Sequence, residues 1–207
     1  MLKLLHIQAS PRAESYSTRV AEALLEEYRR LHPRDQIETL DVFESGLPQF
    51  EAPAAAAKYA VLAGQAPHSR AGRAWKKVIK TIEQFSSADK VVISSAMWNF
   101  SIPYRLKQYL DVIVQPGLTF KYSAEKGYEG LVTGRPAVLI LARGGAYGGE
   151  GAAFDFQKPY LRAILGFIGF ADIREVIIEP TLQAGPAVAE EKARQAEKLA
   201  RKLAAEI

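Results

Sequence analysis

Residues 2–41 read LKLLHIQASPRAESYSTRVAEALLEEYRRLHPRDQIETLD and contain a strand, a helix and a second strand in succession. The apolar run over residues 2–7 predicts a buried strand, and from Ser17 onward apolar residues recur at helical spacing. His32-Pro33 ends the helix, and the alternating residues 36–41 predict a second, short strand. The stretch is therefore one βαβ unit, which is the building block of a parallel sheet.

The same alternation extends over the rest of the chain. Further strands are expected at residues 90–95, 136–142 and 173–178. One or two helices are expected within residues 46–87, and a further helix after residue 102 has Pro103 in its first turn. Two more helices are expected, around residues 159–167 and from about Val188. Residues 120–134 are expected to be irregular, with room for a small hairpin. This pattern predicts an α/β protein whose parallel sheet is covered on both faces and binds ligands beyond the carboxyl ends of its strands.

Size and composition favour one globular domain. The 207 residues suit one hydrophobic core, so a single domain over residues 1–207 is expected. Apolar residues make up 48% and charged residues 24%, which excludes a disordered chain. The N-terminus lacks the pattern of a signal peptide and no apolar run is long enough to span a membrane. We therefore expect a cytoplasmic protein that does not associate with membranes.

Several kinds of chemistry have no support in the sequence. The formal charge of +4 is spread among acidic residues instead of being gathered in blocks, so nucleic acid is not an expected partner. The absence of cysteine excludes thiolate catalysis and cysteine-bound metals. The glycine motifs of dinucleotide and triphosphate sites, the zinc-protease motif and the serine-hydrolase elbow do not occur, and His6, His32 and His68 are not spaced as a metal cluster. A bound cofactor would then have to supply the reactive atoms.

The loop over residues 10–18 follows the first strand and is rich in hydroxyl groups. A phosphate at the start of the following helix would meet unpaired backbone N–H groups together with the hydroxyls of Ser15, Ser17 and Thr18. The alternative is that Ser15 or Ser17 only caps the helix. Taken alone, the loop favours neither interpretation.

The loops after the third and fourth strands add aromatic and glycine residues. Residues 97–100, Met-Trp-Asn-Phe, offer flat apolar contacts and amide hydrogen bonds to a planar ring, although Trp98 and Phe100 could instead fill the edge of the core. Residues 142–149 contain Arg143 and a glycine cluster, which would let the backbone approach a ligand closely and stabilise negative charge, or would form a plain flexible turn. Only the convergence of all three loops at one edge of a sheet favours a common site.

Together these segments resemble the FMN-dependent NADH-azoreductase family, also described as NAD(P)H:quinone oxidoreductases. The resemblance covers most of the chain and is carried by Ser10-Pro-Arg, Ser15-Tyr-Ser17, Met97 to Pro103, Gly117 to Phe120, Gly130 to Gly134, Arg143-Gly-Gly145 and Leu165 to Gly169. It implies a flavodoxin-like three-layer sandwich with a five-stranded parallel sheet in the order 2-1-3-4-5. It also implies a homodimer with one tightly bound FMN per subunit and NADH or NADPH as co-substrate.

The resemblance also assigns residues. The implied FMN-binding residues are Ser10, Ser15, Tyr16, Ser17, Met97, Trp98, Asn99, Phe100, Ala142, Arg143, Gly144 and Gly145. The resemblance implies substrate-pocket walls at Phe120, Tyr122, Tyr147 and Phe167. A contribution across the dimer is implied for Phe120, Tyr122 and Phe167, with core packing as an equal alternative for Phe167. Trp98 stands where many relatives have Tyr, and Ala146-Tyr147 replaces a pair containing His, which puts substrate preference and a proton-transfer role of that His in doubt.

The activity expected from the resemblance is ping-pong hydride transfer. NAD(P)H would reduce the flavin and leave, and a quinone or an azo compound would then take the electrons, with no catalytic protein side chain and no metal required. A flavodoxin-type electron carrier is the main alternative, but such a carrier would be expected to have an acidic docking face, whereas this chain is basic. A hydrolase acting on a phosphopantetheine-like group is a weaker alternative, because neither a nucleophile nor a metal site is recognisable.

Overall fold

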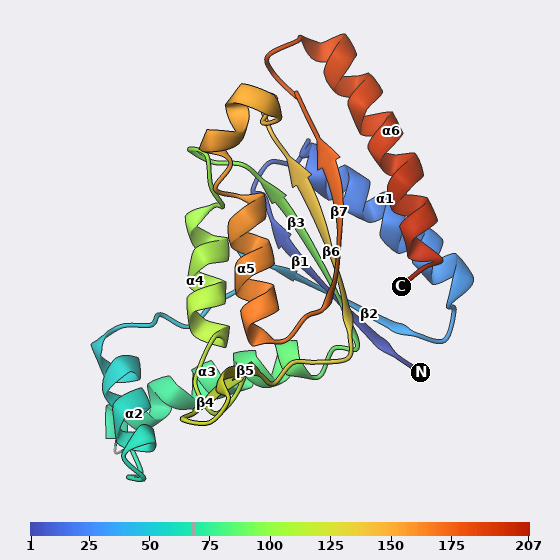
Figure 1. Cartoon of the computed structure of the whole chain (residues 1–207). Coiled ribbons are helices and arrows are strands. Elements are labelled where there is room, and N and C mark those ends of the chain that lie inside the picture. Colours follow the sequence, from blue (N-terminus) through green and yellow to red (C-terminus); the bar gives the residue numbers. More distant parts are fainter. Residues whose placement is uncertain (68) are drawn as a thin grey trace.

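A twisted sheet of five parallel strands runs through the centre of the molecule (Figure 1). The computed structural model describes residues 1–67 and 69–207. The strands are β1 (Lys3–Ala9), β2 (Gln36–Asp41), β3 (Lys90–Ala96), β6 (Pro136–Ala142) and β7 (Asp172–Ile178), in the order β2-β1-β3-β6-β7. The predicted order 2-1-3-4-5 is confirmed, because β4 (Phe120–Ser123) and β5 (Gly127–Gly130) pair separately as the antiparallel hairpin that the sequence allowed.

Helices cover both faces of the sheet, so the predicted α/β sandwich is confirmed. Helices α1 (Tyr16–Leu31) and α6 (Pro186–Ala204) cover one face, and α3 (Ser69–Ser86), α4 (Tyr104–Ile113) and α5 (Lys158–Ile168) cover the other (Figure 1). Helix α2 (Ala52–Leu62) packs beside α3, so the segment before β3 holds two helices. The sequence had placed Pro103 in the first turn of α4, but Pro103 is the N-cap residue, one position before the helix begins.

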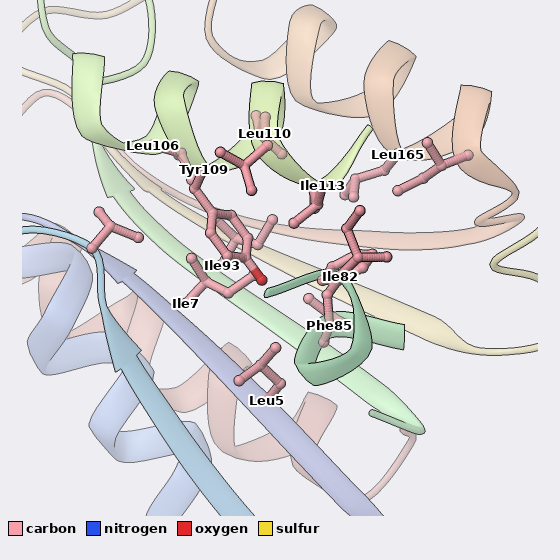
Figure 2. Packing of buried hydrophobic residues seen from close by; sticks show 14 of the residues in the cluster. Leu5, Ile7, Ile82, Phe85, Ile93, Leu106, Tyr109, Leu110, Ile113 and Leu165 are labelled. Atoms are coloured by element: carbon pink, nitrogen blue, oxygen red, sulfur yellow. The ribbon is translucent and has the colours of Figure 1, made fainter. Parts of the chain in front are cut away.

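The two apolar layers follow from the alternation of side chains along buried strands. Leu5, Ile7 and Ile93 point toward α3, α4 and α5, where Figure 2 shows them against Tyr109 and Phe85. Leu4, Val92, Val138, Ile140 and Val176 point the other way, toward α1 and α6. Full burial of each large aliphatic side chain contributes roughly 1.5–3 kcal/mol, so the two layers stabilise the alignment of the strands. This alignment brings the carboxyl ends of the strands together at one edge of the sheet.

The connections at the carboxyl edge of the sheet are β1–α1, β2–α2, β3–α4, β6–α5 and β7–α6, and the fourth of them contains the short 3₁₀ helix η1 (Gly149–Phe154). The β4–β5 hairpin lies at the opposite end, beside the start of β6 (Figure 1). Within the described residues, no helix has the length and apolar content needed to cross a bilayer. The fold thus separates one loop-rich edge from one hairpin-bearing edge.

Candidate functional site

A cavity of about 420 Å³ opens at the carboxyl edge of the sheet. Its size falls within the range of sites that hold a small-molecule ligand or cofactor. Four strand-to-helix connections line it, through Ser10, Pro11, Arg12, Ser15, Tyr16, Ala96, Met97, Trp98, Ala142, Gly144, Thr181, Leu182, Gly185 and Pro186. The structure therefore brings together residues from all three loops that the sequence analysis singled out.

The β1–α1 loop forms a hydroxyl-rich helix start. Ser15 is the N-cap of α1, and its Oγ accepts a hydrogen bond from the Thr18 amide at 3.3 Å and lies 3.0 Å from the Ser17 Oγ. Ser15 therefore does cap the helix, as the alternative interpretation held. The other N–H groups of the first turn nevertheless have no partner within the helix. The buried Thr18 Oγ1 also has no hydrogen-bond partner. These free donors make the helix start suited to an anion such as a phosphate.

The β3–α4 loop turns sharply at the rim of the cavity. The amide of Met97 donates to the Ala142 carbonyl at 2.8 Å, which ties the loop to the end of β6. Trp98 and Ser101 exchange backbone hydrogen bonds of 2.9 and 3.0 Å, and the two residues between them have positive φ angles, 46° at Asn99 and 70° at Phe100. A positive φ at phenylalanine is strained, and such strain is concentrated at functional sites.

Aromatic rings lie on both sides of this turn. Trp98 lines the cavity and contacts Phe43, with ring centroids 5.7 Å apart, whereas the Phe100 ring meets Tyr147 edge to face at 6.3 Å. Trp98 is 38% and Phe100 46% exposed, so the alternative that they fill the edge of the core is wrong. Phe100 and Asn99 are not among the lining residues, although they belong to the same turn as Met97 and Trp98.

The β6–α5 loop places glycine backbone, and not a charged side chain, against the cavity. Ala142 and Gly144 line it, and within the described residues the amides of Gly144 and Gly145 have no protein acceptor. The Arg143 guanidinium is only 2% exposed and lies 3.0 Å from an Asp155 carboxylate oxygen. The prediction that this guanidinium faces negative charge on a ligand is therefore wrong, because the guanidinium is paired with carboxylates inside the protein.

The β7–α6 loop is a wall that the sequence analysis missed. Thr181, Leu182, Gly185 and Pro186 all line the cavity. The amides of Leu182 and Gln183 both donate to the Gly144 carbonyl at 3.0 Å, so this loop is joined directly to the glycine loop. The Gly185-Pro186 pair at the helix start was its one available sequence signal.

Three of the four predicted substrate-pocket residues lie far from this cavity. Phe120, Tyr122 and Phe167 belong to an aromatic cluster around the β4–β5 hairpin and the end of α5, where the Phe120 and Phe167 ring centroids are 4.7 Å apart. The hairpin and the end of α5 lie at the opposite end of the sheet from the strand-to-helix loops that line the cavity (Figure 1). The fourth residue, Tyr147, lies on the cavity side, beside Phe100. One chain alone therefore does not place all four around one pocket.

The histidines and carboxylates do not form a reactive cluster in the part of the chain that the structure describes. No group of three or more metal-ligating side chains is found there, and His68 lies outside the described residues. His6 is buried on β1 with its Nε2 2.9 Å from the Ser94 Oγ. Burial lowers the pKa of His6 to about 4, against an opposing effect of Asp41, so this imidazole is neutral at neutral pH.

Known proteins resemble this chain along its whole length. A profile of proteins with a flavodoxin-like fold matches residues 2–203. The chain is 52% identical to an FMN-dependent NADH:quinone oxidoreductase of Nitratidesulfovibrio vulgaris (strain DP4), covering 100% of both chains. Among solved structures, an azoreductase from Bacillus anthracis str. Sterne superposes with a TM-score of 0.93 at 31% identity, covering 100% of both chains. An FMN-dependent NADH-azoreductase from Bacillus anthracis str. Ames Ancestor, solved in complex with FMN, superposes with a TM-score of 0.88 at 29% identity, covering 99% of this chain and 100% of that one.

Proposed function

The chain belongs to the family of FMN-dependent NADH:quinone oxidoreductases, which share the flavodoxin-like fold, and from this membership we propose that it reduces quinones with electrons from NADH. The observation that carries the proposal is the cavity at the carboxyl edge of the sheet, whose lining combines a helix start, an aromatic turn and a glycine loop. A flavin mononucleotide requires this combination, because it has a phosphate, a flat ring and heteroatoms that accept and donate hydrogen bonds.

Each loop has a proposed role in holding FMN. Ser10 and residues 15–17 would bind the phosphate, where the first turn of α1 presents its free N–H groups. Residues 97–100 would border the isoalloxazine ring, and the unpaired amides of Gly144 and Gly145 would donate to its polar edge. These protein groups orient the ring and exclude water, and no side chain needs to form a covalent bond with the substrate.

Bound FMN would supply the redox chemistry, taking a hydride from NADH and passing the electrons to a second substrate that enters after NAD⁺ leaves. A quinone would become a hydroquinone in one such cycle. An aromatic azo compound would need two cycles for cleavage to amines, and we include this activity because solved azoreductases have the same fold over the full chain. A cytoplasmic location and a single domain over residues 1–207 remain predictions.

We also propose that the active protein is a homodimer. The aromatic cluster of the hairpin lies at the wrong end of the sheet to cover the cavity of its own chain. Tyr122 and Tyr128 of this cluster are 65% and 66% exposed, which is unusual for large aromatic side chains. A second copy that brings its hairpin over the cavity would bury these rings and supply the missing wall of the substrate pocket.

The test is reduction and reoxidation of the purified protein. A yellow protein whose flavin absorbance is bleached by NADH without oxygen, and restored by the naphthoquinone menadione, is the expected result. Bleaching by a chemical reductant but not by NADH or NADPH would favour the electron-carrier alternative. Apoprotein that does not take up added FMN would contradict both flavin-based functions.

A further inference from the structure

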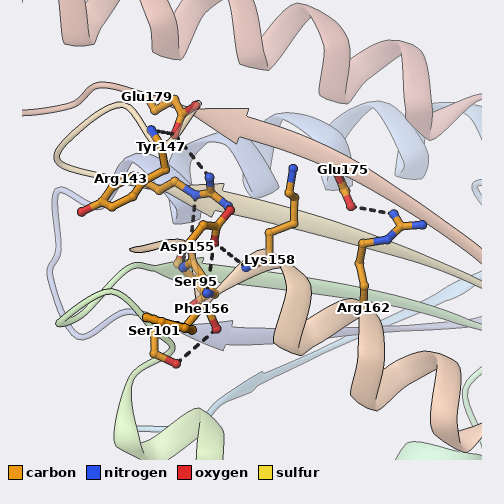
Figure 3. Close-up of polar contacts among 11 residues, drawn as sticks. Ser95, Ser101, Arg143, Tyr147, Asp155, Phe156, Lys158, Arg162, Glu175 and Glu179 are labelled. Atoms are coloured by element: carbon orange, nitrogen blue, oxygen red, sulfur yellow. Dashed lines mark hydrogen bonds and ion pairs between the residues drawn. The ribbon is translucent and has the colours of Figure 1, made fainter. Parts of the chain in front are cut away.

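Arg143 is a charged side chain buried beneath the cavity, at the point where its loops meet. Its Nε donates to the Gln157 Oε1 at 3.1 Å and its Nη1 to the Glu179 Oε2 at 3.3 Å. Its Nη2 lies 3.0 Å from the Asp155 Oδ2, an ion pair without hydrogen-bond geometry. Figure 3 shows the guanidinium between Asp155 and Glu179, and Arg143 is only 2% exposed.

Each partner of the guanidinium holds a different segment of the cavity. Asp155 accepts hydrogen bonds from the amides of Gln157 at 3.1 Å and Lys158 at 3.0 Å, and so fixes the start of α5. The Gln157 side chain donates to the Ser95 carbonyl near the end of β3 at 3.4 Å. Glu179, at the end of β7, accepts a hydrogen bond from the Tyr147 amide at 3.2 Å. One guanidinium thus joins segments that follow or end β3, β6 and β7.

The backbone of Arg143 extends the same junction to the β7–α6 wall. The Arg143 carbonyl accepts hydrogen bonds from the Thr181 amide at 2.8 Å and from the Thr181 Oγ1 at 2.9 Å. The next residue, Gly144, accepts from Leu182 and Gln183, both at 3.0 Å. Both Thr181 and Leu182 line the cavity, whereas the guanidinium does not reach it.

We propose that Arg143 is a positioning residue for FMN: it sets the placement of the Gly144 and Gly145 amides and of the Thr181–Leu182 wall without touching the cofactor. Its planar fork, which addresses partners in several directions at once, explains why arginine occupies the position. A lysine would keep the positive charge but could not hold Gln157, Asp155 and Glu179 together. The inference rests on the proposed FMN site.

The principal test compares Arg143→Lys with Arg162→Lys. Arg162 lies on the neighbouring α5 and pairs with Glu175 of β7 at 2.6 Å, but this exposed pair is outside the junction (Figure 3), so it is a matched control. Apoprotein of each variant is titrated with FMN, and the visible circular dichroism of the bound flavin is recorded. Arg143→Lys is expected to raise the FMN Kd by about tenfold or more, because part of the binding free energy must then order the loops, and to change the flavin dichroism. Arg162→Lys should change neither.

Two milder variants keep the test decisive if Arg143→Lys does not fold. Thr181→Val replaces with a methyl group the hydroxyl that donates to the Arg143 carbonyl, and Glu179→Gln removes one charge from the junction. Both should raise the FMN Kd above the wild-type value, and by less than Arg143→Lys does where that variant folds. Folded variants that bind FMN with wild-type affinity and dichroism, while losing only thermal stability, would show that Arg143 serves the scaffold alone and would overturn the proposal. Failure of the wild-type apoprotein to bind FMN would instead contradict the proposed function.

Discussion

Ser15 and Ser17 lie two residues apart at the start of α1, but their hydroxyl groups have different structural roles. Ser15 caps the helix, so Ser15→Ala is expected to lower the free energy of unfolding of the apoprotein by about 1 kcal/mol. Within the described residues the Ser17 Oγ has a hydrogen bond only with the Ser15 Oγ and caps nothing, so Ser17→Ala should cost less stability. Both variants should weaken FMN binding if the proposed site is right, because each hydroxyl would donate to the phosphate there.

Urea unfolding of the apoprotein and fluorescence titration with FMN separate these two effects. A serine that acts only as a cap would lower stability without changing the FMN Kd. If the double variant Ser15→Ala/Ser17→Ala retains wild-type affinity for FMN, the phosphate does not lie at this helix start.

His6 predicts a pH dependence of stability whose sign follows from its burial. Its folded-state pKa of about 4 is below the unfolded value near 6.5, so between these values the unfolded chain binds the proton more readily. The free energy of unfolding therefore falls as the pH falls from 6.5 to 4, by about 3 kcal/mol in total from this group. Above pH 6.5 the contribution of His6 is fully present.

Denaturation curves collected across this pH window check the prediction. His6→Gln keeps a polar partner for Ser94 but does not titrate, so its unfolding free energy should fall less steeply as the solution is acidified. Parallel curves for the two proteins would mean that His6 is protonated in the folded state as easily as in the unfolded one.

At the scale of helices and strands, most of the fold could be predicted because burial leaves a periodic pattern. The strand at 36–41 and the strand at 136–142 were predicted with their observed bounds, and the others to within two residues at either end. The buried strands are continuous apolar runs, and the helices have apolar stripes that face them. Only the hairpin and the division of residues 46–87 into α2 and α3 were left open, because the hairpin strands are only four residues long and α2 is rich in alanine, which gives no clear apolar stripe.

The candidate site could be predicted only in part. The residues quoted from the three loops have distinctive composition, and seven of the fourteen lining residues were among those predicted to bind FMN. The β7–α6 wall has no such composition and reaches the cavity only because it is hydrogen-bonded to Gly144. The direction of the Arg143 side chain depends on Asp155 and Glu179, which are distant in the sequence, and no local pattern specifies such partners.

The β4–β5 hairpin depends on a close approach of backbone to backbone. A Cβ atom on Gly130 would lie 2.3 Å from the Gly169 amide nitrogen, just after the end of α5, and backbone cannot give way as a side chain can. We expect Gly130→Ala to cost more than about 2 kcal/mol of stability and to displace the hairpin from α5. Gly127→Ala is the control, because a Cβ there meets open space and the cost is limited to the strain of its positive φ, about 1 kcal/mol.

Thermal unfolding and the near-ultraviolet circular dichroism of the hairpin tyrosines measure these two costs. The prediction fails if Gly130→Ala is no less stable than Gly127→Ala. That result would show that the hairpin moves freely with respect to α5, contrary to the hydrogen bond of 2.8 Å from the Val132 amide to the Ile168 carbonyl.

At the scale of the whole molecule, the cavity and the aromatic hairpin occupy opposite ends of one chain. A symmetric dimer uses the same surfaces twice, so a hairpin that covers the partner's cavity implies two equivalent composite sites. Each site would then take its FMN-binding loops from one subunit and its aromatic wall from the other. The basic net charge of +4 does not oppose such pairing, because Lys and Arg are interspersed with Asp and Glu.

This arrangement predicts complementation between two defective chains. Ser15→Ala/Ser17→Ala should impair the proposed FMN pocket, and Tyr122→Ala/Tyr128→Ala removes exposed hairpin rings whose loss should leave the fold intact. Each homodimer should be weakly active as a quinone reductase. If the hairpin serves the partner's cavity, a heterodimer combines an intact pocket from one chain with an intact hairpin from the other, and a randomly mixed sample should recover about a quarter of wild-type activity. If the hairpin serves its own chain, every site in the heterodimer keeps one defect, so mixing and reassociating the two variants would restore nothing.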